Sequence, residues 1–264
     1  MTGPAETGGR LAIADLAVSF GSRRVVSIAE LALGHAEILG LAGESGSGKS
    51  MTTLAVLGLA HTVGATVSGS IRLDGRELTG LSAEDLRRIR GRRIAAIFQS
   101  PATAFSPVYR VGAVVTKALR LHGATKPEAA DRAAEAMRQV LLSPDLLRRY
   151  PSQLSGGQLQ RVAIALAVAL RAEVLLADEP TSALDVTVQA EVLDLLRELR
   201  ETIGMSILFI SHDLAVVAEL CDRVAVMRQG LIVEQGPASQ VLSAPAHPYT
   251  AELLESVPKL AGRP

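Results

Sequence analysis

The pattern of apolar and polar positions changes character twice along the chain. From residue 11 to about residue 78, short apolar runs separated by turn residues predict mostly β-strands. Apolar residues then recur at helical spacing over residues 111–121 and 127–142, where Pro127 suits a first helical turn. After Gly157, helical and strand patterns alternate as far as Met227. Such alternation implies parallel strands that are joined by helical crossovers.

Turn and capping residues set the bounds of the shorter elements. Asp74 and Gly75 separate two strand-like runs, and both tolerate the positive φ of a tight hairpin turn. Ser82 and Asp85 form a capping-box pattern that predicts a short helix to about Arg90. The remaining predicted strands are residues 37–42, 94–98, 174–177, 206–210, 223–227 and 231–234, and the remaining predicted helices are residues 50–59, 157–171, 186–202, 214–221 and 250–256.

Composition places the chain among folded globular proteins. Its 264 residues are 48% hydrophobic, which is ample for a buried core. The 27 basic and 27 acidic residues cancel, so no long-range positive field predicts a nucleic-acid partner. Cys221 is the only cysteine, which excludes an internal disulfide. The longest strictly apolar run, residues 162–170, is far short of the roughly 20 residues of a membrane-spanning helix, and we expect a core helix there.

Residues 43–50 read Gly-Glu-Ser-Gly-Ser-Gly-Lys-Ser, which matches the phosphate-binding pattern G-x-x-x-x-G-K-[ST]. Glycines at this spacing let successive backbone N–H groups turn toward phosphates, Lys49 supplies a positive charge, and the Ser50 hydroxyl is a ligand for Mg²⁺. A strand pattern precedes the loop and a helical pattern follows it, which favours a nucleotide site over a chance glycine-rich turn. The nucleotide-contacting residues predicted here are Gly43, Glu44, Ser45, Gly46, Ser47, Gly48, Lys49, Ser50 and Met51.

A second candidate site follows the apolar run of residues 174–177. Asp178 stands at the end of this predicted strand, where a carboxylate can hold Mg²⁺ beside bound phosphates. Glu179 comes next and can orient or deprotonate an attacking water. An acidic pair after a strand is otherwise a solvated turn, but the phosphate loop favours the catalytic interpretation.

Residues 154–158 read Leu-Ser-Gly-Gly-Gln and stand directly before a predicted helix. The Ser155 hydroxyl and the amides after it would make an anion site at the helix N-terminus, while a serine cap followed by a glycine turn is the simpler alternative. These five residues resemble the signature of the ATP-binding cassette (ABC) family. Other segments match that family in its usual order: Phe98-Gln99 resembles its glutamine loop, residues 182–185 its aspartate loop and residues 210–213 its switch-histidine segment.

The resemblance extends from about residue 11 to residue 235 and implies roles for single residues. Gln99 would contact Mg²⁺ and the attacking water, His212 would contact the γ-phosphate, and Asp185 would couple two ATP sites. Phe20 occupies the place of the aromatic residue that stacks on adenine in the family. Each assignment has an alternative, because a histidine after a strand is often a surface or capping residue and a lone phenylalanine in a strand is usually core.

The family resemblance also implies the fold and the domains. We expect an α/β fold with a P-loop NTPase core and a mostly parallel sheet, an N-terminal antiparallel β-subdomain and an inserted α-helical subdomain. The ATPase domain would span residues 11–244, with its helical subdomain at about residues 100–157, and residues 245–264 would form a short C-terminal tail. In this family the signature of one subunit completes the ATP site of another. The chain is therefore expected to act as a pair in which the partner's ATP contacts Ser155, Gly156, Gly157 and Gln158.

Two further segments narrow the expected function. Residues 99–107 and residues 232–236, the latter followed by Pro-Ala-His-Pro-Tyr-Thr at 245–250, resemble the oligopeptide, dipeptide and nickel importer group. The resemblance implies an ATPase subunit that couples ATP hydrolysis to uptake of peptides or nickel chelates. Its partners would be a second ABC ATPase subunit, two transmembrane permease subunits and, indirectly, an extracytoplasmic solute-binding protein. It would lie at the cytoplasmic face of the bacterial inner membrane.

Alternatives and departures remain at this point. The chain could instead be a soluble ABC-type ATPase that acts on DNA or ribosomes, or a nucleotide sensor without turnover in which Glu179 is idle. Ser106 stands where the importer group often has asparagine, and Met51 stands where threonine is common. Ala104 with Phe105 and the short tail favour the nickel branch over the peptide branch.

Overall fold

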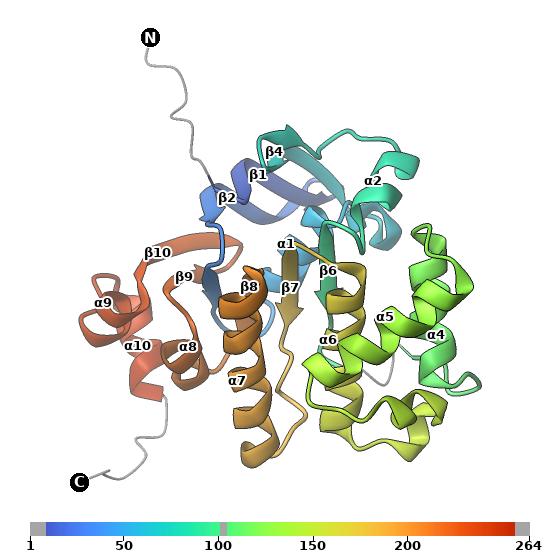
Figure 1. The fold of residues 1–264 in the computed structure, drawn as a ribbon. Coiled ribbons are helices and arrows are strands. Elements are labelled where there is room, and N and C mark those ends of the chain that lie inside the picture. The colour runs from blue at the N-terminus through green and yellow to red at the C-terminus, as the bar shows by residue number, and fades with distance from the viewer. Residues whose placement is uncertain (1–8, 101–104, 257–264) are drawn as a thin grey trace, which may run out of the picture. The chain divides into compact units, whose positions relative to one another are not determined.

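The computed structural model describes residues 9–100 and 105–256, which form two compact units (Figure 1). The first unit combines Met1–Leu81 with Ser206–Pro264, and the second is Ser82–Met205. The predicted segment at residues 99–107 therefore lies partly outside the described residues, as does the end of the predicted tail. Among the described residues, no helix is both long enough and apolar enough to span a membrane.

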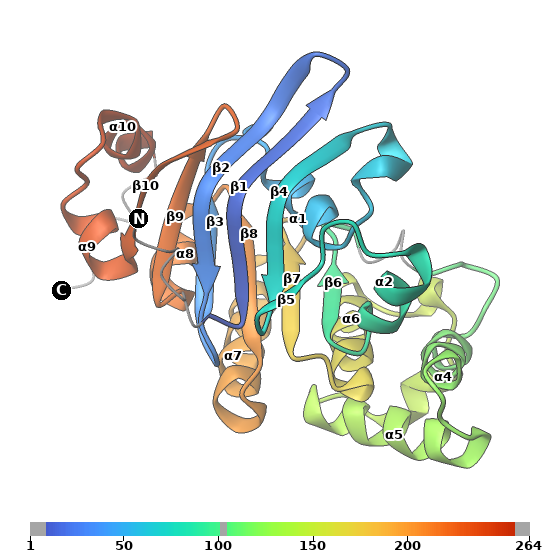
Figure 2. The same cartoon turned by 90° about the horizontal axis from the view of Figure 1, so that it is seen from above.

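The first unit begins with an antiparallel sheet in the order β2-β1-β4-β5, whose three long strands lie side by side in Figure 2. Its strands are β1 (Leu11–Phe20), β2 (Arg23–Leu33), β4 (Thr66–Leu73) and β5 (Arg76–Glu77). The predicted hairpin turn is confirmed, because Asp74 and Gly75 both have positive φ, at 46° and 77°. This sheet is the expected N-terminal antiparallel part of the fold.

A bulge in β1 decides which of its side chains face the core. Leu11 and Ile13 are buried, and so are Leu16 and Val18, so the buried positions change from odd to even numbers along one strand. The register with β4 shifts between Ala14 and Ala17, which inserts the residue needed for that change.

The second sheet of this unit is mixed and mostly parallel. Strands β9 (Arg223–Arg228), β3 (Ile38–Ala42) and β8 (Ser206–Ser211) run parallel to one another, and β10 (Leu231–Pro237) pairs antiparallel with β9. Every residue of β3 and β8 is buried. Continuous apolar runs of this kind are expected for parallel strands that are covered on both faces.

The helices of the first unit are short. They are α1 (Lys49–Val56), the 3₁₀ helix η1 (Ala60–Val63), α8 (Leu214–Leu220), α9 (Ala238–Ser243) and α10 (Pro248–Ser256). The prediction of one helix over residues 50–59 was too long, because Gly58 takes φ 63° and ends α1 in a left-handed turn. Helix α9 was not predicted at all.

The second unit is mainly helical around two parallel strands, β6 (Ile94–Ile97) and β7 (Val174–Asp178). Its α-helices are α2 (Ala83–Ile89), α4 (Val111–Leu121), α5 (Lys126–Gln139), α6 (Gly156–Leu170) and α7 (Val186–Ile203), with 3₁₀ turns at η2 (Pro144–Arg148) and η3 (Pro151–Gln153). Helix α5 packs against both α4 and α6. The apolar run at residues 162–170 lies in α6, and all of its residues except Ala163 and Leu166 are buried, so the expectation of a core helix is confirmed.

A polar cluster closes the hairpin between β4 and β5. The Glu77 carboxylate accepts hydrogen bonds from the Ser70 hydroxyl and from the backbone N–H groups of Ile71, at 2.9 Å, and Thr79, at 3.0 Å. Burial opposes ionisation of Glu77, but these hydrogen bonds outweigh it and lower the pKa of Glu77 to about 2.

We predict that Glu77→Gln lowers the free energy of unfolding at pH 7 by about 1 kcal/mol, because the amide is a weaker acceptor and the half-exposed site screens the loss. A carboxylate whose pKa is depressed by folding stabilises the protein above the unfolded value of 4.5, and this stabilisation is lost as the pH falls toward about 2. Urea unfolding at pH 7 and pH 3 should therefore show a smaller difference from the parent at pH 3. Glu30→Gln, which changes an exposed carboxylate of the same sheet, is the control. An equal deficit at both pH values would contradict the assignment.

Candidate functional site

The predicted phosphate-binding loop connects β3 to α1 in the first unit. Gly43, Gly46 and Gly48 have φ values of 148°, 81° and 111°, in the region that side-chain-bearing residues avoid. A Cβ atom on Gly43 would lie 2.2 Å from the Met227 carbonyl oxygen of β9. At Gly46, in contrast, a Cβ atom would meet no atom within 4 Å. The loop thus rests against β9 at its start and faces open space at its middle.

Lys49 is buried with its ammonium group turned into this loop. Its relative exposure is 5%, and Nζ donates to the carbonyl oxygens of Gly43, at 2.6 Å, and Glu44, at 2.7 Å. Ser50 follows in the first turn of α1 and is exposed. The lysine charge and the serine hydroxyl therefore stand where the sequence pattern placed them, at the start of a helix whose dipole favours anions.

Two other predicted residues of the first unit lie at strand ends. Phe20 is the last residue of β1 and is 39% exposed, so the alternative that it is a core residue is wrong. His212 directly follows β8 and is exposed. The capping of α8 falls to its neighbour Asp213, whose Oδ1 accepts from the N–H of Ala215 at 2.8 Å.

In the second unit, Gln99 and Glu179 are hydrogen-bonded to each other. Gln99 Nε2 donates to Glu179 Oε2 at 2.9 Å, although 80 residues separate the two in sequence. Asp178 ends β7 and is 5% exposed, and Glu179 follows it with φ 49°. A non-glycine residue in the left-handed region costs free energy and is found preferentially at functional sites.

The signature segment forms the N-terminus of α6. The Ser155 hydroxyl accepts from the Gln158 N–H at 3.2 Å, and the Gln158 side chain accepts from the Ser155 N–H at 3.1 Å. Within one chain, Ser155 is therefore the helix cap that the simpler alternative describes. Close packing explains why position 157 is a glycine, because a Cβ atom there would lie 2.2 Å from Val188 Cγ1 of α7.

Asp185 also acts as a cap within the chain. Its Oδ1 accepts from the N–H of Val188 at 3.0 Å and begins α7.

The sequence did not reveal which groups outside the phosphate loop form hydrogen bonds with its backbone. The turn between β9 and β10 was predicted only as a turn, yet the Gly230 N–H donates to the Ser47 carbonyl at 2.8 Å. The Tyr249 hydroxyl accepts from the Glu44 N–H at 3.3 Å. The His-Pro-Tyr-Thr segment was noted in the sequence, but no local pattern links it to a loop that is 205 residues away.

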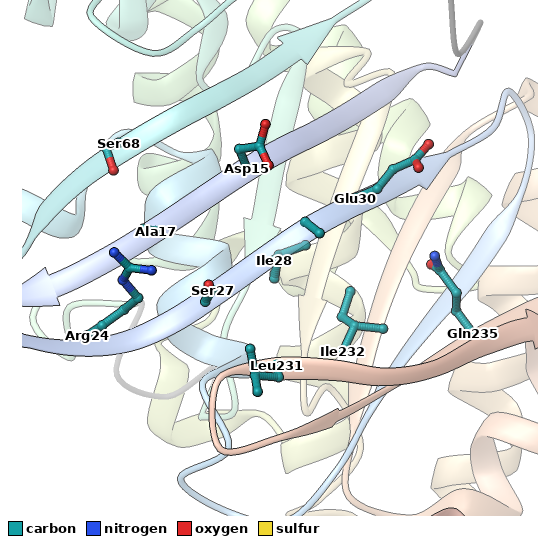
Figure 3. A pocket seen from close by; sticks show the side chains of 11 residues that line it. Asp15, Ala17, Arg24, Ser27, Ile28, Glu30, Ser68, Leu231, Ile232 and Gln235 are labelled. Atoms are coloured by element: carbon teal, nitrogen blue, oxygen red, sulfur yellow. The ribbon is translucent and has the colours of Figure 1, made fainter. Parts of the chain in front are cut away.

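A hollow of about 620 Å³ lies elsewhere in the first unit (Figure 3). It is lined by side chains of β1, β2, β4 and β10, among them Asp15, Arg24 and Glu30. The predicted site residues are not among the residues that line it.

Comparison with known families gives two matches. A family model described as "ABC transporter" matches residues 26–182, which is more than half of the chain. A second model, described as "Oligopeptide/dipeptide transporter, C-terminal region", matches residues 233–263.

Curated relatives are similar over most of the chain. A putative peptide import ATP-binding protein of Brucella abortus (strain 2308) is 44% identical over 268 residues, covering 98% of this chain and 80% of that protein. A probable peptide ABC transporter ATP-binding protein of Sinorhizobium fredii is 47% identical, covering 84% of this chain and 68% of that protein. The glutathione import ATP-binding protein GsiA of Salmonella paratyphi A is 48% identical, covering 87% of this chain and 38% of GsiA.

Solved structures share the fold. The protein cbiO1 from Clostridium perfringens, part of the ABC transporter complex cbiONQ, has a TM-score of 0.78 at 25% identity, covering 90% of this chain and 92% of cbiO1. A dimeric ATP-binding cassette in a post-hydrolysis state with ADP and Pi has a TM-score of 0.74 at 26% identity, covering 86% of this chain and 98% of the other. With a family match over more than half of its length and relatives that are 44% identical over nearly all of it, the chain belongs to the ABC transporter family.

Proposed function

We propose that this chain is the ATP-binding and ATP-hydrolysing subunit of an ABC importer that takes up peptides. The observation that carries the proposal is the phosphate loop, with three glycines at positive φ and a buried Lys49 turned into it. Relatives named for peptide and glutathione import supply the transport class. They give no support to an ATPase that acts on DNA or ribosomes, and the nickel branch stays a prediction.

The loop suits the polyphosphate of ATP. Three of its residues are glycines at positive φ, a backbone conformation that suits a phosphate-binding turn, and the open space at Gly46 leaves room for a ligand. Lys49 is held by two carbonyl oxygens at the start of the loop, so its charge lies close to that space. Phe20 is 39% exposed, so a ligand can reach this residue, which would fit the adenine-stacking role that the family resemblance gives it.

The predicted Mg²⁺ ligands are oxygen donors of the kind that this ion prefers. They are the exposed hydroxyl of Ser50, the buried carboxylate of Asp178 and the side-chain amide of Gln99. When bound, Mg²⁺ would neutralise the charge that develops on the transferring phosphoryl group.

Glu179 is proposed as the group that orients the attacking water and accepts its proton. Its left-handed backbone turns the chain sharply at the end of β7, and the Gln99 amide fixes one carboxylate oxygen. The Glu179 carboxylate would accept the proton of the attacking water. Lys49 and His212 are proposed to stabilise the γ-phosphate as negative charge moves onto it.

Two chains are proposed to complete one another's ATP sites. Ser155 and Gly157 would bind the nucleotide of a partner chain through the N-terminus of α6, and Asp185 would couple the two sites. ATP would thus hold the pair together and hydrolysis would release it. The pair would sit on two transmembrane permease subunits, at the cytoplasmic face of the bacterial inner membrane, and receive cargo indirectly from an extracytoplasmic solute-binding protein.

Replacing Glu179 by Gln is predicted to lower kcat for ATP by about 100-fold or more, because the amide cannot accept the proton. ATP binding should persist, so ATP should trap a stable pair that light scattering detects. Glu201→Gln, which changes an exposed carboxylate on α7, is the matched control and should hydrolyse ATP like the parent. Parental turnover in the Glu179 variant would reject its role and revive the sensor without turnover.

The Ser155 proposal needs a control for helix capping. Ser155→Ala and Ser82→Ala each remove a serine cap, from α6 and α2, and each should cost about 1 kcal/mol of stability. Only Ser155→Ala should also weaken ATP-dependent pairing, measured by light scattering in a Glu179→Gln background. If the two variants pair equally well, Ser155 is a cap and nothing more.

A further inference from the structure

The His-Pro-Tyr-Thr segment at residues 247–250 has no part in the function proposed above, yet it is tightly held. In the first unit it begins α10, which follows β10 and α9 (Figure 1). The Glu234 carboxylate of β10 accepts from the N–H groups of Ala246, at 2.8 Å, and His247, at 3.1 Å. Charge-assisted bonds of this kind fix the backbone just before the helix.

The first turn of α10 directs Tyr249 into the protein. The His247 Nδ1 atom accepts from the Tyr249 N–H at 3.1 Å and so caps the helix, while Pro248 suits its first position. Tyr249 is 2% exposed, and the Arg228 guanidinium lies 4.5 Å from the centre of its ring. Burial raises the pKa of Tyr249, so its hydroxyl stays protonated at neutral pH.

The Tyr249 hydroxyl and the Lys49 ammonium hold opposite ends of one peptide group. The peptide between Gly43 and Glu44 donates its N–H to Tyr249 Oη at 3.3 Å and accepts Lys49 Nζ at its carbonyl oxygen at 2.6 Å. Because a trans peptide is planar, its N–H and its C=O point in opposite directions and rotate together. A rotation that frees the N–H from Tyr249 therefore also turns the carbonyl away from Lys49.

This peptide needs an external restraint. Gly43, at φ 148°, has no Cβ atom to limit its rotation, and the flexibility that lets it pass close to β9 also lets the following peptide turn. The phenol sits at the end of a short, rigid side chain whose ring is packed under Arg228. It is thus suited to fix the orientation of the peptide.

We propose that Tyr249 is a positioning residue for ATP binding, which orients the peptide between Gly43 and Glu44 and through it the Lys49 ammonium. The inference rests on the proposed function, because it assumes that the loop binds ATP. The C-terminal segment would thus support the phosphate loop. Glu234 and His247 fix the backbone at the start of α10, and Tyr249 extends from that backbone to the loop.

Tyr249→Phe removes only the hydroxyl and keeps the ring under Arg228. We expect the KM for ATP of the full chain to rise about two- to fivefold, as befits the loss of one long hydrogen bond, with kcat within about twofold of the parent. Hydrogen exchange of the peptide that contains the Glu44 amide should speed up by a similar factor. Tyr109→Phe, which changes an exposed tyrosine, is the matched control and should change neither quantity.

The outcomes separate this inference from the function on which it rests. If the parent chain neither binds nor hydrolyses ATP, the proposed function fails. If the parent is active and Tyr249→Phe keeps both its KM and its Glu44 exchange rate, the positioning role is overturned. Should Tyr249→Phe unfold at the assay temperature, Glu234→Gln offers a second test. It leaves Tyr249 in place but weakens its anchor, and it should raise the KM in the same direction; an unchanged KM would count against the role.

Discussion

The phosphate loop depends on the close approach of two backbones. Gly43 lies so near the Met227 carbonyl that a single Cβ atom would come within 2.2 Å of it. This close approach requires a residue without a side chain at position 43. Glycine in turn permits the positive φ with which the loop starts. The Gly230 N–H, the Tyr249 hydroxyl and the Lys49 ammonium then hold the loop through its own peptide groups. The surrounding strands and side chains thus keep the backbone of the loop in place.

In the second unit, two residues to which the family resemblance gives a role in ATP binding or coupling also stabilise helices of their own chain. Ser155 and Asp185 both cap helices with short hydrogen-bonding loops, a contact that is worth about 1 kcal/mol to each helix. Each cap accepts from one N–H group of its helix, and the other unpaired N–H groups of the first turn remain directed toward the end of the helix, where an anion can bind. Glu179 differs, because its left-handed backbone is a cost that helix formation does not explain.

Most elements were predictable where local signals agree. The turn at Asp74 and Gly75, the cap at Ser82 and the bounds of α4 all follow from residues that are neighbours in sequence. Predictions failed where the local signal was weak or was overruled. Helix α9 has only six residues and no side-chain cap, and α1 stops early because Gly58 adopts a left-handed turn. The change of face in β1 comes from a bulge that its alternating pattern does not announce.

The sequence by itself determined which residues are candidates for the chemistry of this protein. The glycines, Lys49 and Ser50 of the phosphate loop, and the acidic pair at Asp178 and Glu179, are recognisable because their spacing fixes their conformation over a few residues. Only the tertiary structure decided which distant residues contact them. The Met227 carbonyl lies close to Gly43, the Tyr249 hydroxyl accepts from the Glu44 N–H, and the Gln99 amide donates to Glu179. These contacts join residues that are 80 to 205 positions apart, and they depend on how strands and helices pack. No local sequence pattern predicts which distant residues will meet.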